Sequence, residues 1–159
     1  MKKILPLLCL LAVAFSLAAP APGSPDAAAK SAAAPASPKD SRQAQAALRQ
    51  LIAAYAAGEQ AGLEALVSPD MIGYAGVVDA ARQSRPLQRQ LRITLSDLRA
   101  QASPDAGLVL IQARWEKRFV RLPAGTQVRK SGAAVFSFKR TEAGWKLSGL
   151  SGDNPFAAD

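Results

Sequence analysis

The sequence of 159 residues contains no histidine and a single cysteine, Cys9. Without histidine, the chain cannot build the Ser-His or Cys-His pairs that activate nucleophiles in many hydrolases. It also lacks the imidazole ligands, and nearly all of the thiolate ligands, on which most zinc and copper sites depend. Acid–base chemistry would therefore fall to Asp, Glu, Tyr or Lys side chains with shifted pKa values. We predict no metal, no cofactor and no recognisable catalytic residue.

Long hydrophobic runs are equally scarce, and the one that stands out lies at the N-terminus. Two lysines precede an apolar run over residues 4–17, and small residues surround Ala18, the pattern of a secretory signal peptide. The run is too short for the roughly 20 residues of a membrane-spanning helix, which argues against a membrane anchor. Lipidation of Cys9 is disfavoured because Leu8 stands where a small residue is required.

We therefore expect a signal peptidase to cleave between Ala18 and Ala19 and to remove residues 1–18. The mature chain would be periplasmic or secreted, without a cysteine and without stable insertion in a membrane.

Residues 19–40 contain nine alanines and five prolines but no Val, Ile, Leu or aromatic residue. Such a segment cannot bury enough apolar surface to offset the entropy of ordering itself. We predict a disordered linker here, followed by a single domain over residues 41–156, which is long enough for one hydrophobic core.

Positive charge is concentrated in residues 82–130, with eleven Lys or Arg against three acids. A basic surface attracts nucleic acid, anionic lipids or acidic polymers. Export argues against nucleic acid, so an anionic component of the cell envelope is the candidate partner of this region. The alternative is a solvated, arginine-rich sheet face without a partner.

Two helices are predicted in the first half of the domain. Ser41 is a candidate N-cap for a helix whose apolar residues recur at helical spacing: Leu48, Leu51, Ile52 and Tyr55. A second, shorter helix is expected from Asp79, as its cap, to about Gln90, with a bend at Pro86.

After Gln90 the hydrophobic period changes to two, which predicts strands. The first strand begins at Leu91 and ends before turn residues 103–107, and three further strands are expected over 108–122, 126–140 and 145–150. One face of the second strand should be buried: Val109, Ile111, Ala113, Trp115 and Phe119. Trp115 and Trp145, with Phe136 and Phe138, are expected to form an aromatic core. Helices followed by an antiparallel meander indicate an α+β fold.

Two segments, Ile52–Asp70 and Gly132–Leu150 with its Gly144-Trp145-Lys146-Leu147 turn, resemble the nuclear transport factor 2-like superfamily. The resemblance covers residues 43–152. It implies the cone-shaped, cystatin-like fold that ketosteroid isomerases and scytalone dehydratase share, in which helices pack on a curved four-stranded sheet. It further implies an interior pocket and homodimers that pair through the sheet. It transfers no active site, because the chain has no histidine and a tyrosine with two carboxyl groups cannot be placed on it.

Six residues are candidates for lining a pocket: Tyr55, Tyr74, Arg114, Trp115, Glu116 and Asp153. Arg114, Glu116 and Arg118 share one face of a strand, which either lines the cone as an anion site or lies in solvent or a dimer interface. The tyrosines and Trp115 have an alternative role as core residues.

Taken together, these features predict an exported, non-enzymatic binding or assembly domain that pairs through its sheet. One alternative is a cone that binds a small apolar or anionic ligand. The other is a lyase or isomerase, which would need a carboxyl group buried beside a tyrosine hydroxyl.

Overall fold

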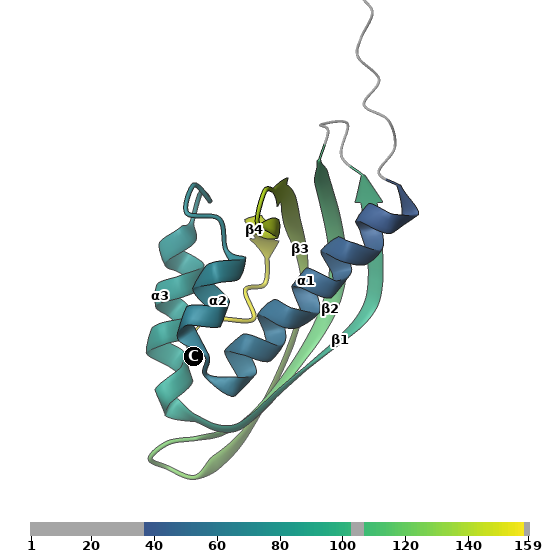
Figure 1. Ribbon diagram of the computed structural model, residues 1–159. Coiled ribbons are helices and arrows are strands. Elements are labelled where there is room, and N and C mark those ends of the chain that lie inside the picture. Colours follow the sequence, from purple (N-terminus) through teal and green to yellow (C-terminus); the bar gives the residue numbers. More distant parts are fainter. Residues whose placement is uncertain (1–36, 103–106, 158–159) are drawn as a thin grey trace, which may run out of the picture. The chain divides into compact units, whose positions relative to one another are not determined.

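The computed structural model describes residues 37–102 and 107–157, so the expected signal peptide, its cleavage site and most of the expected linker lie outside the described residues. In these residues, helices come first and strands follow. The elements are α1 (Pro38–Ala57), α2 (Gln60–Leu66), α3 (Tyr74–Ser84), the short 3-10 helix η1 (Arg85–Leu87), β1 (Gln88–Ala102), β2 (Leu108–Arg121), β3 (Thr126–Thr141) and β4 (Gly144–Gly152). The strands form one antiparallel sheet in the order β1-β2-β3-β4. Figure 1 shows the three α-helices on one side of it, which confirms the predicted α+β class.

The first helix starts earlier than expected. Ser37, not Ser41, is its N-cap, and the Ser37 side chain accepts a hydrogen bond from the Asp40 backbone amide. Pro38 occupies the first helical position, where its missing N–H has no intrahelical role. Residues 38–40, expected in the linker, therefore belong to α1. The helix ends at Ala57, and its C-cap is Gly58, whose positive φ of 82° suits glycine.

The second expected helix is also displaced toward the N-terminus. Helix α3 begins at Tyr74 after Gly73, and Asp79 lies inside it, paired with Arg82 rather than capping a helix. Val77, Val78 and Ala81 are buried, and the first two of them lie in the part of the helix before Asp79. At the other end, Pro86 lies in η1 and β1 already begins at Gln88.

Strand β2 lies inside the sheet. It pairs with β3 along its whole length, and with β1 over most of its length with two register shifts. Its odd-numbered side chains from Val109 to Phe119 are buried under the helices, and its even-numbered side chains point to the opposite face, as the two-residue period of a strand requires. We call the two faces the inner face and the outer face. The inner face of β2 confirms the buried set predicted from sequence and adds Lys117.

The core lies between the inner face and the helices. Leu48 and Leu51 of α1 are fully buried, as are Phe136 and Phe138 of β3, and the two tryptophans are at most 8 % exposed. This confirms the predicted aromatic core. No described helix combines the length and the hydrophobicity needed to cross a bilayer.

Close packing at one point of the sheet requires glycine. Gly132 of β3 lies opposite Trp115 of β2. A Cβ atom at position 132 would lie 2.7 Å from the Trp115 ring and 2.6 Å from Asp153 Cβ. The indole ring and the segment after β4 can therefore approach β3 only because residue 132 has no side chain.

We predict that Gly132→Ala lowers the free energy of unfolding by about 1–3 kcal/mol, the usual effect of overpacking. Urea unfolding followed by circular dichroism measures it. Gly76→Ala in α3 is the matched control, because no heavy atom lies within 4 Å of its added Cβ. It should instead stabilise the helix, by up to about 1 kcal/mol. Equal stability of Gly132→Ala and the natural protein would contradict the close approach.

Candidate functional site

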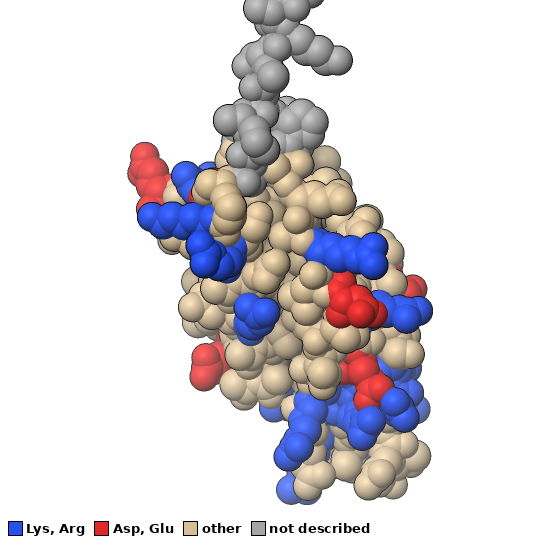
Figure 2. Space-filling view, turned by 90° about the vertical axis from the view of Figure 1, so that its right-hand side faces the viewer, with Lys and Arg blue, Asp and Glu red and all other residues tan. Residues whose placement is uncertain are grey.

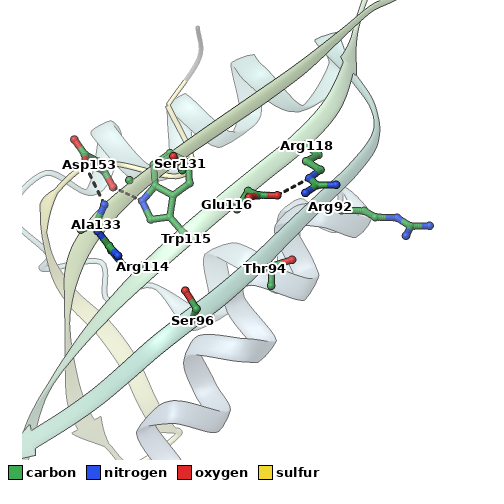
Figure 3. Close-up of a pocket in the computed structure, with 11 residues that line it drawn as sticks. Arg92, Thr94, Ser96, Arg114, Trp115, Glu116, Arg118, Ser131, Ala133 and Asp153 are labelled. Atoms are coloured by element: carbon green, nitrogen blue, oxygen red, sulfur yellow. Dashed lines mark hydrogen bonds and ion pairs between the residues drawn. The ribbon is translucent and has the colours of Figure 1, made fainter.

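A groove crosses the outer face of the sheet, on the side away from the helices. It has a volume of about 880 Å3 and is lined by residues of three adjacent strands and of the segment after β4. Its lining residues are Arg92, Thr94, Ser96, Arg114, Trp115, Glu116, Arg118, Ser131, Gly132, Ala133 and Asp153. Figure 3 shows how these side chains lie. We call this feature the outer groove.

Strand register sets the order of charges in the outer groove. Arg92 of β1, Arg118 of β2 and Arg129 of β3 occupy one row across the sheet. In the next row Glu116 lies between Thr94 and Ser131, and in the following row Arg114 lies between Ser96 and Ala133. The alternating charges of β2 thus all face outward, away from the interior of the cone.

Glu116 is held by two arginines. Its carboxylate accepts from Arg129 and from Arg118, and these hydrogen bonds, with that from Arg129 contributing most, lower the pKa of Glu116. Among the residues that the structure describes, no carboxylate pairs with Arg92 or Arg114.

The outer face as a whole carries more arginine than carboxylate. Its arginines are Arg92, Arg99, Arg114, Arg118 and Arg129, and the carboxylates near them are Asp97, Glu116 and Asp153. Figure 2 shows Lys and Arg side chains gathered toward the bottom of the domain, with acidic side chains among them.

Asp153 and the inner-face residue Trp115 border the outer groove beside Gly132. The Asp153 carboxylate accepts from the Ala133 backbone amide at 3.0 Å, and the Trp115 indole N–H donates to the Asp153 backbone carbonyl at 2.9 Å. Four of the six candidates named from sequence, Arg114, Trp115, Glu116 and Asp153, therefore meet here. Tyr55 and Tyr74 do not: Tyr55 lies in the interior, and Tyr74 is partly buried at the start of α3.

Inside the cone, three polar side chains converge on the Tyr55 hydroxyl. It lies 2.7 Å from Ser84 Oγ, donates to Gln88 Oε1 at 3.1 Å and accepts from Lys117 Nζ at 3.1 Å. All four side chains are at most 3 % exposed. We call Tyr55, Ser84, Gln88 and Lys117 the interior cluster.

The segment after β4 fills the remaining space beside the interior cluster. Lys117 donates to the backbone carbonyls of Pro155 and Ala157, and the Phe156 ring is fully buried against Tyr55. Side chains and this segment thus occupy the cone near Tyr55.

Sequence reasoning identified Tyr55 but missed Lys117, Ser84 and Gln88. Lys117 could have been found from its position, because it stands between buried Trp115 and Phe119 in the period of the strand. Ser84 and Gln88 carry no comparable signal, since each lies at the end of an element whose boundary was misplaced.

The composition of the interior cluster determines which acid–base groups the described interior offers. In the described part of the chain the buried polar side chains are Ser84, Gln88 and Lys117 together with the Tyr55 hydroxyl, and none is a carboxylate. A group of three or more His, Cys, Asp or Glu that could hold a metal ion is likewise not found among the described residues. The described interior therefore does not supply the carboxyl that the lyase or isomerase alternative requires.

Tyr55→Phe should lower the free energy of unfolding by about 1–3 kcal/mol, because it leaves buried partners without their hydrogen bonds. Tyr74→Phe removes the other tyrosine hydroxyl, which makes no hydrogen bond within the described structure. It should change stability by less than about 0.5 kcal/mol. Thermal and urea unfolding of both variants provide the comparison, and equal effects would refute the role assigned to Tyr55.

The comparisons with known proteins concern the fold. Neither a protein-family model nor a curated protein sequence matches the chain. Solved structures do match. A nuclear transport factor 2-like superfamily protein from Salmonella enterica has a TM-score of 0.64 at 10 % identity, covering 74 % of this chain and 92 % of its own.

Two other similar structures carry names of activities. A candidate dehydratase of the nuclear transport factor 2-like family from Streptomyces avermitilis has a TM-score of 0.62 at 18 % identity, covering 72 % of this chain and 95 % of its own. Hexachlorocyclohexane dehydrochlorinase LinA-type3 from Novosphingobium barchaimii has a TM-score of 0.58 at 16 % identity, covering 74 % and 90 %. At such identities the likeness establishes the fold and leaves the activity open.

Proposed function

We propose that this chain, which has the nuclear transport factor 2-like fold predicted from its sequence, is an exported binding domain whose outer groove takes an anionic polymer of the cell envelope. The observation that carries the proposal is the position of the arginines. They line an open groove on a sheet face that no described element covers, whereas the interior of the cone is filled.

The arginines suit phosphate or carboxylate groups. A guanidinium presents a planar set of donors that can bind such an anion through two parallel hydrogen bonds. Arg92 and Arg114 have no carboxylate partner among the described residues and reach into the outer groove from two different strands. Arg118 shares Glu116 with Arg129 and adds a third guanidinium.

The shape of the face favours an extended ligand. A hollow of about 720 Å3 adjoins the outer groove at Arg114 and Ala133 and includes Arg99. Another, of about 800 Å3, adjoins it at Arg92 and Arg118 and includes Arg129. The three hollows follow one another along β2, so a chain of repeated anionic groups could contact successive arginines.

A polymer fits this face better than a membrane surface does. Binding at a bilayer interface usually combines basic residues with large apolar side chains that enter the acyl region. In the described part of the chain, the exposed large apolar residues are Ile72, before α3, and Leu87, in η1. Neither belongs to the outer groove.

Homodimer formation through the same face remains part of the proposal. A two-fold axis would set the face of one copy against the identical face of another. Glu116 of one copy would then face an arginine of the second. Because arginines outnumber carboxylates on this face, repulsion between the arginines of the two copies would be only partly compensated. An anionic polymer should therefore compete with pairing.

The enzymatic alternative draws its support from similar structures that carry the names of a dehydrochlorinase and a candidate dehydratase. This support rests on the fold. The interior cluster offers a lysine and a tyrosine but, within the described chain, no buried carboxylate, so we favour the binding role.

Replacement of Arg92, Arg114 and Arg118 by glutamine should weaken binding of long-chain inorganic polyphosphate on the order of 100-fold, since each basic residue near an anionic surface contributes about 1 kcal/mol. Fluorescence anisotropy at several NaCl concentrations would also show a shallower salt dependence. The control carries the same change in charge on the exposed side of α1: Lys39→Gln, Arg42→Gln and Arg49→Gln. Equal losses of affinity in both variants would mean that net charge, and not the position of the arginines, determines binding. Preference for phosphatidylglycerol vesicles over polyphosphate would point to a lipid surface instead.

Native mass spectrometry of the protein purified from its own host tests export and pairing together. We expect a mass that corresponds to cleavage between Ala18 and Ala19, and a dimer that dissociates when polyphosphate is added. An uncleaved chain would contradict export. A monomer at all concentrations would contradict pairing while leaving the proposed polymer binding intact.

A further inference from the structure

Three arginines lie next to one another in a single row across the outer face. Arg92 of β1 pairs with Arg118 of β2, which in turn pairs with Arg129 of β3. All three are exposed, and together they line a hollow of about 800 Å3. Like charges directly opposite each other on neighbouring strands destabilise a sheet. We call these residues the arginine row, and an anion bound among them would relieve a repulsion that the strand register creates.

A β-bulge brings Arg92 into the arginine row. Gln88 and Arg92 are four residues apart and would share a face in a regular strand, yet Gln88 is buried and Arg92 is exposed. The change of face occurs where two residues of β1, Gln90 and Leu91, lie opposite Phe119 alone. Gln90 has a φ of 53°, a conformation that costs energy in a residue other than glycine. The strand is thus strained at the point where a bulge turns an arginine outward.

Glu116 already occupies part of the arginine row as an internal anion. Its side chain is 28 % exposed, and its carboxylate accepts from Arg118 and Arg129. Arg92 has no carboxylate partner among the described residues. Figure 3 shows the Glu116 carboxylate directed at the Arg118 guanidinium and the Arg92 side chain extending away from β1. One carboxylate therefore serves two of the three guanidinium groups and leaves the row with an excess of positive charge.

We infer that the arginine row is a phosphate site, so that the polymer of the outer groove, whose binding is the function proposed above and on which this step rests, carries phosphate groups rather than carboxylates. Guanidinium groups bind phosphate oxygens through paired, charge-assisted hydrogen bonds. On binding, phosphate oxygens take the place of the Glu116 carboxylate at Arg118 and Arg129 and also accept from Arg92.

The spacing of the row distinguishes the two kinds of anion. Neighbouring strands lie about 4.8 Å apart, so the three guanidinium groups start from closely spaced positions. A terminal phosphoryl group presents three oxygens, and consecutive phosphoryl groups of a polyphosphate present pairs of oxygens close together. Either can accept from three arginines at once. A carboxylate presents two oxygens, and the next carboxylate of a polyuronate is a whole sugar away.

The surroundings of the arginine row favour phosphate contacts over contacts to bases. Proteins that bind single-stranded nucleic acid usually stack its bases on exposed aromatic side chains. The aromatic ring that lines the hollow of the row, Phe119, is 4 % exposed and belongs to the inner face. A polymer whose phosphates lie close together, and which carries no bases, therefore suits this hollow.

Fluorescence anisotropy should show that the natural protein binds long-chain polyphosphate at least about tenfold more tightly than polygalacturonate at equal charge concentration. A variant with both Arg118→Lys and Arg129→Lys keeps the charge of the row but loses the planar set of donors. Its preference for polyphosphate should fall to about threefold or less.

The matched control carries Arg42→Lys and Arg49→Lys on the exposed side of α1 and should retain the full preference. Circular dichroism shows whether both double variants fold. Equal affinities of the natural protein for the two polymers, or a preference that survives lysine in the row, would overturn the phosphate assignment and leave the binding of an anionic polymer in place.

Isothermal titration calorimetry with inorganic pyrophosphate tests whether ligand and Glu116 compete. Glu116→Gln removes the internal anion and should tighten pyrophosphate binding about tenfold. Asp97→Asn makes the same change of charge on the same face, but Asp97 has no ion pair within the described structure. It should raise the affinity at most about twofold, because salt screens exposed charges that lie apart. Equal gains in both variants, or no binding to either, would overturn the arginine row as the site.

Other sources of phosphate provide the remaining arms. Oligo(dT) and phosphatidylglycerol vesicles should both bind more weakly than polyphosphate. Tighter binding of either would make a nucleic acid or a lipid the partner and overturn the assignment to a phosphate polymer of the envelope. If neither polyphosphate nor polygalacturonate binds, but pyrophosphate binds and does so more tightly to Glu116→Gln, the proposed polymer function fails while the phosphate site stands.

Discussion

The two-residue period of β2 places opposite chemistry on the two faces of a single strand. From Arg114 to Arg118, even-numbered side chains form the charged row of the outer groove, and odd-numbered side chains enter the interior. Because β2 pairs with β1 on one side and β3 on the other, its register fixes the neighbours of both rows. A slip of one residue would bury Glu116 and its arginines and expose Lys117 and the aromatic core. The outer groove and the interior cluster therefore depend on one register.

The interior is closed by the chain itself. Helices α1 and α3 and the inner face of the sheet leave a space that Phe156 and the carbonyls around it complete. Burial of an amino group is unfavourable unless its donors find acceptors. Lys117 finds three oxygens within hydrogen-bond distance, which uses all the donors of an ammonium group. The C-terminal segment is thus as much a part of the core as any strand, although it has no regular secondary structure of its own.

The charges of the outer face, unlike the buried amino group of Lys117, are exposed to solvent. In contact with water, ion pairs contribute little to stability. Glu116 pairs with Arg118 and Arg129, whereas Arg92 and Arg114 have no carboxylate partner among the described residues. Such ion pairs do little to stabilise the fold, and the face is therefore the one to which we assign the proposed binding role.

The α+β class, the four strands and the aromatic core were all predictable from sequence, because each depends on local periodicity: helical spacing in α1 and alternation from β1 to β4. Element ends were less predictable. Ser37 and Gly73, not Ser41 and Asp79, mark the starts of α1 and α3. The Ser37 cap and Pro38 start α1 earlier, and the buried Val77 and Val78 extend α3 before Asp79. The sequence also supplied the charged row of β2, but which face it would occupy depended on where the helices packed. Only the tertiary structure united Tyr55, Ser84, Gln88 and Lys117 with residues 155–157, because contacts between residues so far apart in the chain arise from topology and leave no local pattern.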